Sequence, residues 1–153
     1  MTRSYPFRSA AAAACLLLAT AAAQARTCAL TISSNDQMQF DQAELKVAAD
    51  CKTVDLTLKH SGTLPVSAMG HNWVLTETAA ARAVALAGMN AGAASAYVKP
   101  GDERVIASTP VIGGGGSTRI SFSTDRLAKG GDYTFFCSFP GHWSVMKGKL
   151  VFG

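Results

Sequence analysis

The chain has 153 residues and a formal net charge of +4, a length that suits one domain with a sizeable core. Its lysines and arginines are scattered along the sequence rather than gathered in a run or patch. We therefore expect neither a nucleic-acid binder nor a membrane-surface binder, because both need clustered positive charge.

The first 25 residues have the features of a secretory signal peptide. Arg3 and Arg8 supply a positive start, residues 10–23 form an uninterrupted small or apolar run, and residues 23–25 read Ala-Gln-Ala, a small-x-small cleavage site. The run is short for a membrane span. We predict an exported domain of residues 26–153 with no membrane span after cleavage, and with a formal charge lowered to +2 by the loss of two arginines.

Eight short segments alternate apolar and polar residues with a period of two, as half-buried strands do. Gly, Pro, Asn and Asp lie between them and predict turns. Many short strands with turns between them indicate a β-sandwich or a barrel. In chain order, the segments are residues 28–32, 44–47, 54–60, 72–75, 104–108, 118–123, 133–139 and 147–153.

One segment, residues 76–97, lacks this alternation and is rich in Ala and Leu, which favour helix. It predicts a single helix over roughly residues 79–87, inserted between two strands. Thr78 is a candidate N-cap, and Gly88 or Gly92 is a candidate end.

Four consecutive glycines at residues 113–116 predict a flexible hairpin tip. They do not predict a phosphate loop, because neither the Lys-Ser/Thr pair nor a helical pattern follows them.

Three cysteines remain in the predicted exported domain: Cys28, Cys51 and Cys137. Cys15 leaves with the signal peptide, and a lipoprotein cleavage there is disfavoured because the apolar run continues past it. An odd number in an oxidising compartment predicts one disulfide and one free thiol. Parity alone does not say which cysteine stays free.

The connection between the last two predicted strands contains Cys137, His142 and Met146. A lone buried Cys behaves as a small hydrophobe, and a Met usually fills a core. Together on one hairpin connection, however, a thiolate, an imidazole and a thioether can reach one point. This donor set suits copper, whereas zinc does not seek Met and Mg²⁺ or Ca²⁺ prefers oxygen.

A trigonal copper site needs a second histidine, and only His60 and His71 are left. His71 stands at the start of an apolar strand after a turn, a rigid position that favours a ligand. His60 lies on the apolar face of its own strand, which favours a buried, hydrogen-bonded histidine in the core.

Four stretches of the chain resemble the azurin branch of the cupredoxin family, and they are spread over nearly the whole exported domain. The Cys-x4-His-x3-Met spacing is the form found in azurins. The resemblance implies an all-β fold, a Greek-key cupredoxin β-sandwich of about eight strands with one short inserted helix. The stretches are NDQMQF (35–40), MGHNWVL (69–75), RVIA (104–107) and FFCSFPGHWSVMKGKL (135–150).

The resemblance also implies one type 1 copper ion and its ligands. His71, Cys137 and His142 would be the equatorial ligands. Met146 would be a distant axial ligand, and the Gly70 carbonyl oxygen would approach from the opposite side.

Further roles follow from the same resemblance. Cys28 and Cys51 match a disulfide, which would leave Cys137 as the free thiolate. Asn72 directly follows the expected ligand His71, and from this position we expect it to tie two loops together near the Cys137 sulfur; the alternative is an ordinary turn residue. Backbone N–H groups near Phe139 are expected to donate to that sulfur as well.

The resemblance implies an electron carrier of the Gram-negative periplasm, not an enzyme. Its expected partners are redox proteins, namely c-type cytochrome donors and copper nitrite reductase or another terminal reductase, and we expect a monomer. His142 would be the exit for the electron, within an apolar patch that suits brief encounters. The matching positions are Met38, Leu64, Ala68, Met69, Met89, Phe139 and Pro140.

Two alternatives use the same residues. A periplasmic copper carrier or chaperone would have the same ligands with a labile metal. A thiol enzyme would use a Cys137–His142 dyad, but it would leave His71 and Met146 unexplained and lacks an orienting carboxylate nearby.

Overall fold

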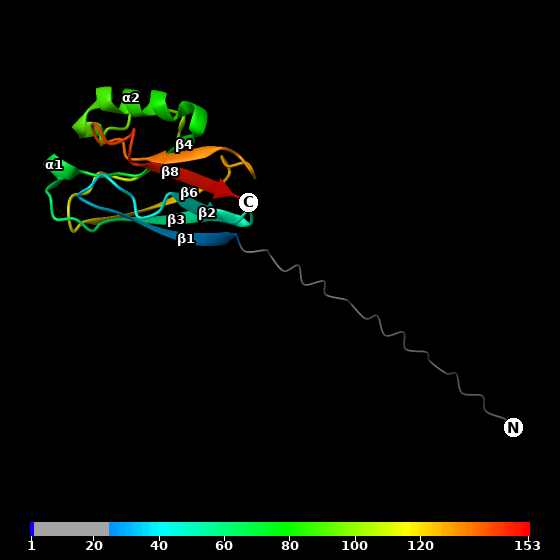
Figure 1. Ribbon diagram of the computed structural model, residues 1–153. Coiled ribbons are helices and arrows are strands. Elements are labelled where there is room, and N and C mark those ends of the chain that lie inside the picture. The colour runs from blue at the N-terminus through cyan, green and yellow to red at the C-terminus, as the bar shows by residue number, and fades with distance from the viewer. Residues whose placement is uncertain (2–24) are drawn as a thin grey trace.

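The computed structural model describes residue 1 and residues 25–153 (Figure 1). The predicted signal peptide, with Cys15, therefore lies outside the described residues. In the described part of the chain, none of the helices has the length and apolar character needed to cross a membrane.

Eight strands form two sheets that pack as the layers of a sandwich (Figure 1), which confirms the predicted fold class. The three-stranded sheet has the order β1-β3-β6, and the five-stranded sheet has the order β2-β8-β7-β4-β5. The pairs β1–β3 and β2–β8 are parallel, and the other pairs are antiparallel. The strands are β1 (Arg26–Ser34), β2 (Glu44–Val47), β3 (Cys51–His60), β4 (Val74–Glu77), β5 (Val105–Ser108), β6 (Ser117–Ser123), β7 (Tyr133–Phe136) and β8 (Lys147–Phe152).

The core between the sheets follows from the period-two pattern. On β3, the alternate residues Val54, Leu56 and Leu58 are fully buried. Trp73 lies between two aromatic rings, with centroid distances of 5.9 Å to Phe122 and 6.0 Å to Phe135. Each of these large side chains contributes about 1.5–3 kcal/mol to folding by leaving water.

A disulfide joins Cys28 on β1 to Cys51 at the start of β3, with a Cα–Cα distance of 5.8 Å. The predicted pairing is therefore confirmed, and Cys137 is a free, buried cysteine. In the chain-entropy model, closing a loop with a sequence separation of 23 stabilises the fold by about 3 kcal/mol.

The inserted helix is present as α2 (Ala81–Ala91), preceded by the 3-10 turn η1 (Thr78–Ala80) and followed by η2 (Ala93–Ser95). It runs later than the predicted residues 79–87. Gly92 ends it with a φ of +76°, a backbone conformation that favours glycine. Gly88 instead lies inside the helix, where an added Cβ would stand 2.0 Å from the Tyr97 carbonyl oxygen.

Thr78 is not the predicted cap of this helix. Its hydroxyl group hydrogen bonds to Asp132 and Thr134, at the start of the neighbouring strand β7. A single helical turn, α1 (Val66–Met69), lies at the end of the sandwich away from the C-terminus, whereas α2 lies over the outer face of the five-stranded sheet (Figure 1).

The glycines at 113–116 do not form a hairpin tip, because β5 and β6 belong to different sheets. The segment crosses between the sheets and packs closely on the loop before α1. Gly114 N–H donates to the Leu64 carbonyl oxygen at 2.8 Å. An added Cβ on Gly113 would lie 2.7 Å from the Val66 backbone, so the close approach requires glycine.

Candidate metal centre

Three buried side chains meet at one end of the sandwich. His71 follows α1 and forms a two-way backbone bridge with Ile112. Cys137 directly follows β7, and His142 lies in the turn between β7 and β8. The Cys137 Sγ atom is 3.7 Å from His71 Nδ1 and 3.6 Å from His142 Nδ1, and the two Nδ1 atoms are 3.3 Å apart. Two nitrogen donors and one sulfur donor therefore surround a single point.

The turn from β7 to β8 is closed by its own backbone. Cys137 N–H donates to the Met146 carbonyl oxygen at 3.0 Å, and Met146 N–H donates to the His142 carbonyl oxygen at 2.8 Å. Gly141 has a φ of +83°, which glycine adopts without strain. The turn thus holds Cys137, His142 and Met146 close together, as the spacing in the sequence predicts.

His71 is oriented by a backbone group. Its Nε2–H donates to the Asn35 carbonyl oxygen at 2.8 Å, so the lone pair of Nδ1 faces the cluster. Burial lowers the pKa of His71 to about 4, and burial also lowers the pKa of His142. Both rings are therefore neutral near pH 7, the state in which an imidazole binds a metal ion.

Cys137 lies in an environment that disfavours a bare anion. Burial raises the pKa of its thiol to about 11, against the opposing effect of hydrogen bonds from the backbone N–H groups of Asn72 and Phe139. These two donors aim at the sulfur and suit a thiolate. A soft cation at the cluster would supply the remaining stabilisation and displace the proton. The donor set and its charge state therefore fit copper.

Asn72 connects three segments around the cysteine. Its Oδ1 accepts a hydrogen bond from Ser138 N–H at 2.8 Å. Its amide group donates to Ser138 Oγ at 2.8 Å and to the Ala96 carbonyl oxygen at 2.9 Å. Asn72 is the loop tie that the sequence predicts. Its partners Ser138 and Ala96 were not predicted, and neither carries a signal in the sequence beyond the adjacency of Ser138 to Cys137.

Gly70 and Met146 also border the cluster. The Gly70 carbonyl oxygen is 3.9 Å from Cys137 Sγ. An added Cβ on Gly70 would lie 2.6 Å from the Val66 carbonyl oxygen and 2.7 Å from Phe139, so only glycine fits there. Met146 is 1% exposed, and its backbone bonds tie it to both Cys137 and His142.

His60 lies beside the cluster without belonging to it. Its Nε2–H donates to the Met69 carbonyl oxygen at 3.0 Å, and its Nδ1 accepts from Gly62 N–H at 3.0 Å. Its ring packs on His71, with the centroids 4.5 Å apart. Both nitrogens are satisfied within the protein, as expected for a histidine of the core.

The predicted docking residues are partly at the surface. Phe139 is half-buried and packs on His142 and on Tyr97, with ring centroids 4.9 and 5.2 Å apart. His142 itself is only 4% exposed. Of the predicted set, Met38, Leu64, Ala68, Met89 and Pro140 are exposed and Met69 is half-buried. Two further exposed apolar residues at this end, Val66 on α1 and Val145 in the β7–β8 turn, were not predicted.

Comparisons with known proteins agree with this geometry. A family model described as copper binding proteins, plastocyanin/azurin family, matches residues 26–153. The chain is 52% identical over 126 residues to an azurin of Bordetella pertussis, covering 82% of this chain and 84% of the relative. It is 51% identical over 126 residues to an azurin of Alcaligenes faecalis, covering 98% of that relative. Among solved structures, the azurin Az-iso2 of Methylomonas sp. strain J superposes with a TM-score of 0.80 at 44% identity, covering 82% of this chain and 98% of the other.

Proposed function

Because the chain belongs to the plastocyanin/azurin family of copper-binding proteins, we propose that it is a periplasmic electron carrier. It takes one electron from a redox protein and passes it to another by outer-sphere transfer. The observation that carries the proposal is the convergence of His71 Nδ1, His142 Nδ1 and Cys137 Sγ within a buried cluster. Bound copper supplies the Cu(II)/Cu(I) couple on which such transfer depends.

In this proposal, His71, Cys137 and His142 would hold the copper ion through two nitrogens and one sulfur. Met146 would offer its thioether sulfur and Gly70 its carbonyl oxygen as weaker ligands. The support is that the buried Met146 is tied by its backbone to two of the ligands, and that Gly70 precedes the third. A soft thioether favours the reduced ion and so raises the redox potential.

The surrounding hydrogen bonds give these ligands fixed positions. The Asn35 carbonyl oxygen holds the ring of His71, and the side chain of Asn72 holds the backbone next to Cys137. A cluster that keeps its geometry in both oxidation states needs little rearrangement when an electron arrives or leaves. Rigid ligation of this kind favours rapid transfer and retention of the metal.

The electron leaves through His142, which contacts the half-buried ring of Phe139. Exposed apolar side chains at this end, including Met38, Leu64 and Val66, would make the docking surface. Such a surface forms brief complexes, because it carries little charge and holds partners weakly. A c-type cytochrome is the expected donor, and copper nitrite reductase or another terminal reductase is the expected acceptor.

The two alternatives have less support. A copper carrier would need ligands that open to release the ion, whereas His71 and Cys137 are 0% exposed and held by the bonds above. A thiol enzyme would need an accessible thiolate with a lowered pKa, and burial raises the pKa of Cys137 instead.

The proposed function is tested by stopped-flow oxidation of a reduced c-type cytochrome by the Cu(II) protein. We expect Val66→Lys to lower the second-order rate constant about tenfold, because a charge placed in an apolar contact must lose water on docking. Val151→Lys is the matched control. Val151 is also an exposed apolar residue, but it lies on β8 away from the cluster. Equal rate constants for both variants would contradict docking at the His142 end.

A further inference from the structure

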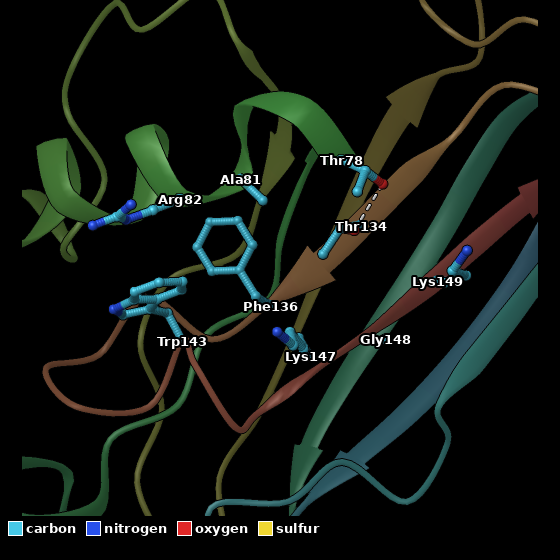
Figure 2. A pocket seen from close by; sticks show the side chains of 9 residues that line it. All are labelled: Thr78, Ala81, Arg82, Thr134, Phe136, Trp143, Lys147, Gly148 and Lys149. Atoms are coloured by element: carbon cyan, nitrogen blue, oxygen red, sulfur yellow. Dashed lines mark hydrogen bonds between the residues drawn. The ribbon is translucent and has the colours of Figure 1, made fainter.

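A groove lies close to the candidate metal centre, since two of its lining residues, Phe136 and Trp143, are sequence neighbours of Cys137 and His142. It has a volume of about 480 Å³ and runs between α2 and the face of the five-stranded sheet formed by β7 and β8 (Figure 2). Its residues come from three places: the start of the helix, the aromatic pair between helix and sheet, and the exposed side of β8. The main ones are Ala81 and Arg82, Phe136 and Trp143, and Lys147 and Lys149.

The floor of this groove is aromatic. Trp143 is half-buried and packs against a small cluster that includes Val84 and Phe136. Phe136 itself is only 1% exposed, so Trp143 presents the accessible aromatic surface. In Figure 2 the two rings lie next to each other below the first turns of α2. An accessible indole of this kind is a stacking surface for a planar apolar group.

The rim of the groove is positively charged. Figure 2 shows Arg82 on the helix side and Lys147 and Lys149 on the strand side. Within residues 25–153, Arg82 and Lys147 form no ion pair and no side-chain hydrogen bond. Lys149 meets Asp132 at 3.9 Å, but both side chains are more than two-thirds exposed, so this pair is weak. No carboxylate is among the described residues that line the groove.

We propose that this groove binds a small aromatic carboxylate. The planar ring stacks on Trp143, and the carboxylate pairs with Arg82 and Lys147 at the rim. A guanidinium group can hold both carboxylate oxygens at once, and the volume is in the range of small-molecule sites. A protein partner fits less well, because stable protein interfaces bury a broad, flatter area. The inference stands on this groove alone and does not depend on electron transfer.

The test is a titration of the copper-loaded, reduced, ¹⁵N-labelled protein with 2-naphthoate, followed by NMR. At about 0.3 kcal/mol per non-hydrogen atom, a ligand of this size should saturate with a Kd of about 1 mM or tighter. We expect the largest shifts at the backbone amides of Arg82 and Lys147 and at the indole N–H of Trp143. The neutral analogue 2-naphthalenemethanol and the cationic 2-naphthylmethylamine should bind at least about tenfold more weakly.

Variants test whether the positive charges at the rim bind the carboxylate, or whether any lost surface charge has the same effect. Arg82→Gln and Lys147→Gln should each raise the Kd about three- to tenfold, whereas Lys52→Gln, an exposed lysine on β3, should not change it. Recording the visible absorption of a portion of every sample before its reduction keeps a failure of copper binding distinct from a failure of this proposal. Equal binding of the neutral analogue, shifts centred outside the groove, or tighter binding of an acidic peptide at these residues would overturn it.

Discussion

Replacing Asn72 with alanine tests whether the hydrogen bonds around the cysteine hold this end of the fold together. Asn72 and Ser138 are 0% and 1% exposed, so bulk solvent does not reach the groups that the lost amide leaves behind. The change removes three hydrogen bonds and leaves the buried Ser138 N–H without an acceptor. One buried orphan donor and two lost bonds together cost about 3 kcal/mol.

The assay for this change is urea unfolding of the copper-free protein, in which a constant slope allows the midpoint shift to be read as a change in stability. Asn90→Ala is the matched control. Asn90 is exposed on α2, and its side chain makes no hydrogen bond within residues 25–153, so its loss should cost under about 0.5 kcal/mol. A loss below about 1 kcal/mol for Asn72→Ala, or an equal loss for both variants, would refute the reasoning.

Three further predictions concern the disulfide, the helix α2 and the buried His71. Replacing Cys28 and Cys51 together with serine should lower unfolding stability by about 3 kcal/mol and leave the visible spectrum of the copper form unchanged. Gly88→Ala should lower the stability of the fold by about 2 kcal/mol, because the new Cβ would meet the Tyr97 carbonyl oxygen. This cost exceeds the better helix propensity of alanine, and a calorimetric gain in stability would contradict the prediction. Because the pKa of His71 is about 4 in the folded chain and near 6.5 when unfolded, the unfolded state binds the extra proton between these values. Copper-free stability should therefore fall as the pH is lowered from about 6.5 to 4. Urea midpoints for a His71→Ala variant should show a shallower slope, because only the contribution of His142, whose pKa burial also lowers, then remains.

Much of the fold could be predicted because its signals are local. Alternation along β3 placed Val54, Leu56 and Leu58 on one face, and the structure buries all three. The cluster could also be predicted, since Cys137 and His142 lie on one short connection between adjacent strands. Soft donors gathered on such a turn are typical of a metal site, so residue type and spacing were enough for the metal hypothesis.

What the sequence did not predict depends on contacts between distant segments. The glycines at 113–116 looked like a hairpin tip, and only the assignment of β5 and β6 to different sheets explains their role. Gly88 looked like a helix end, although its reason is the approach of Tyr97. Nothing local marks Ala96 as a partner of Asn72, because any residue can offer a carbonyl oxygen.

The central claim is that Cys137 binds copper as a thiolate within an electron-transfer site. The most direct test is the visible absorption spectrum of residues 26–153 loaded with Cu(II), beside a Cys137→Ser variant. We predict an intense band in the red region that ascorbate bleaches and that the variant lacks. A colourless protein that nevertheless holds one copper ion per chain would contradict the claim and turn attention to copper carriage.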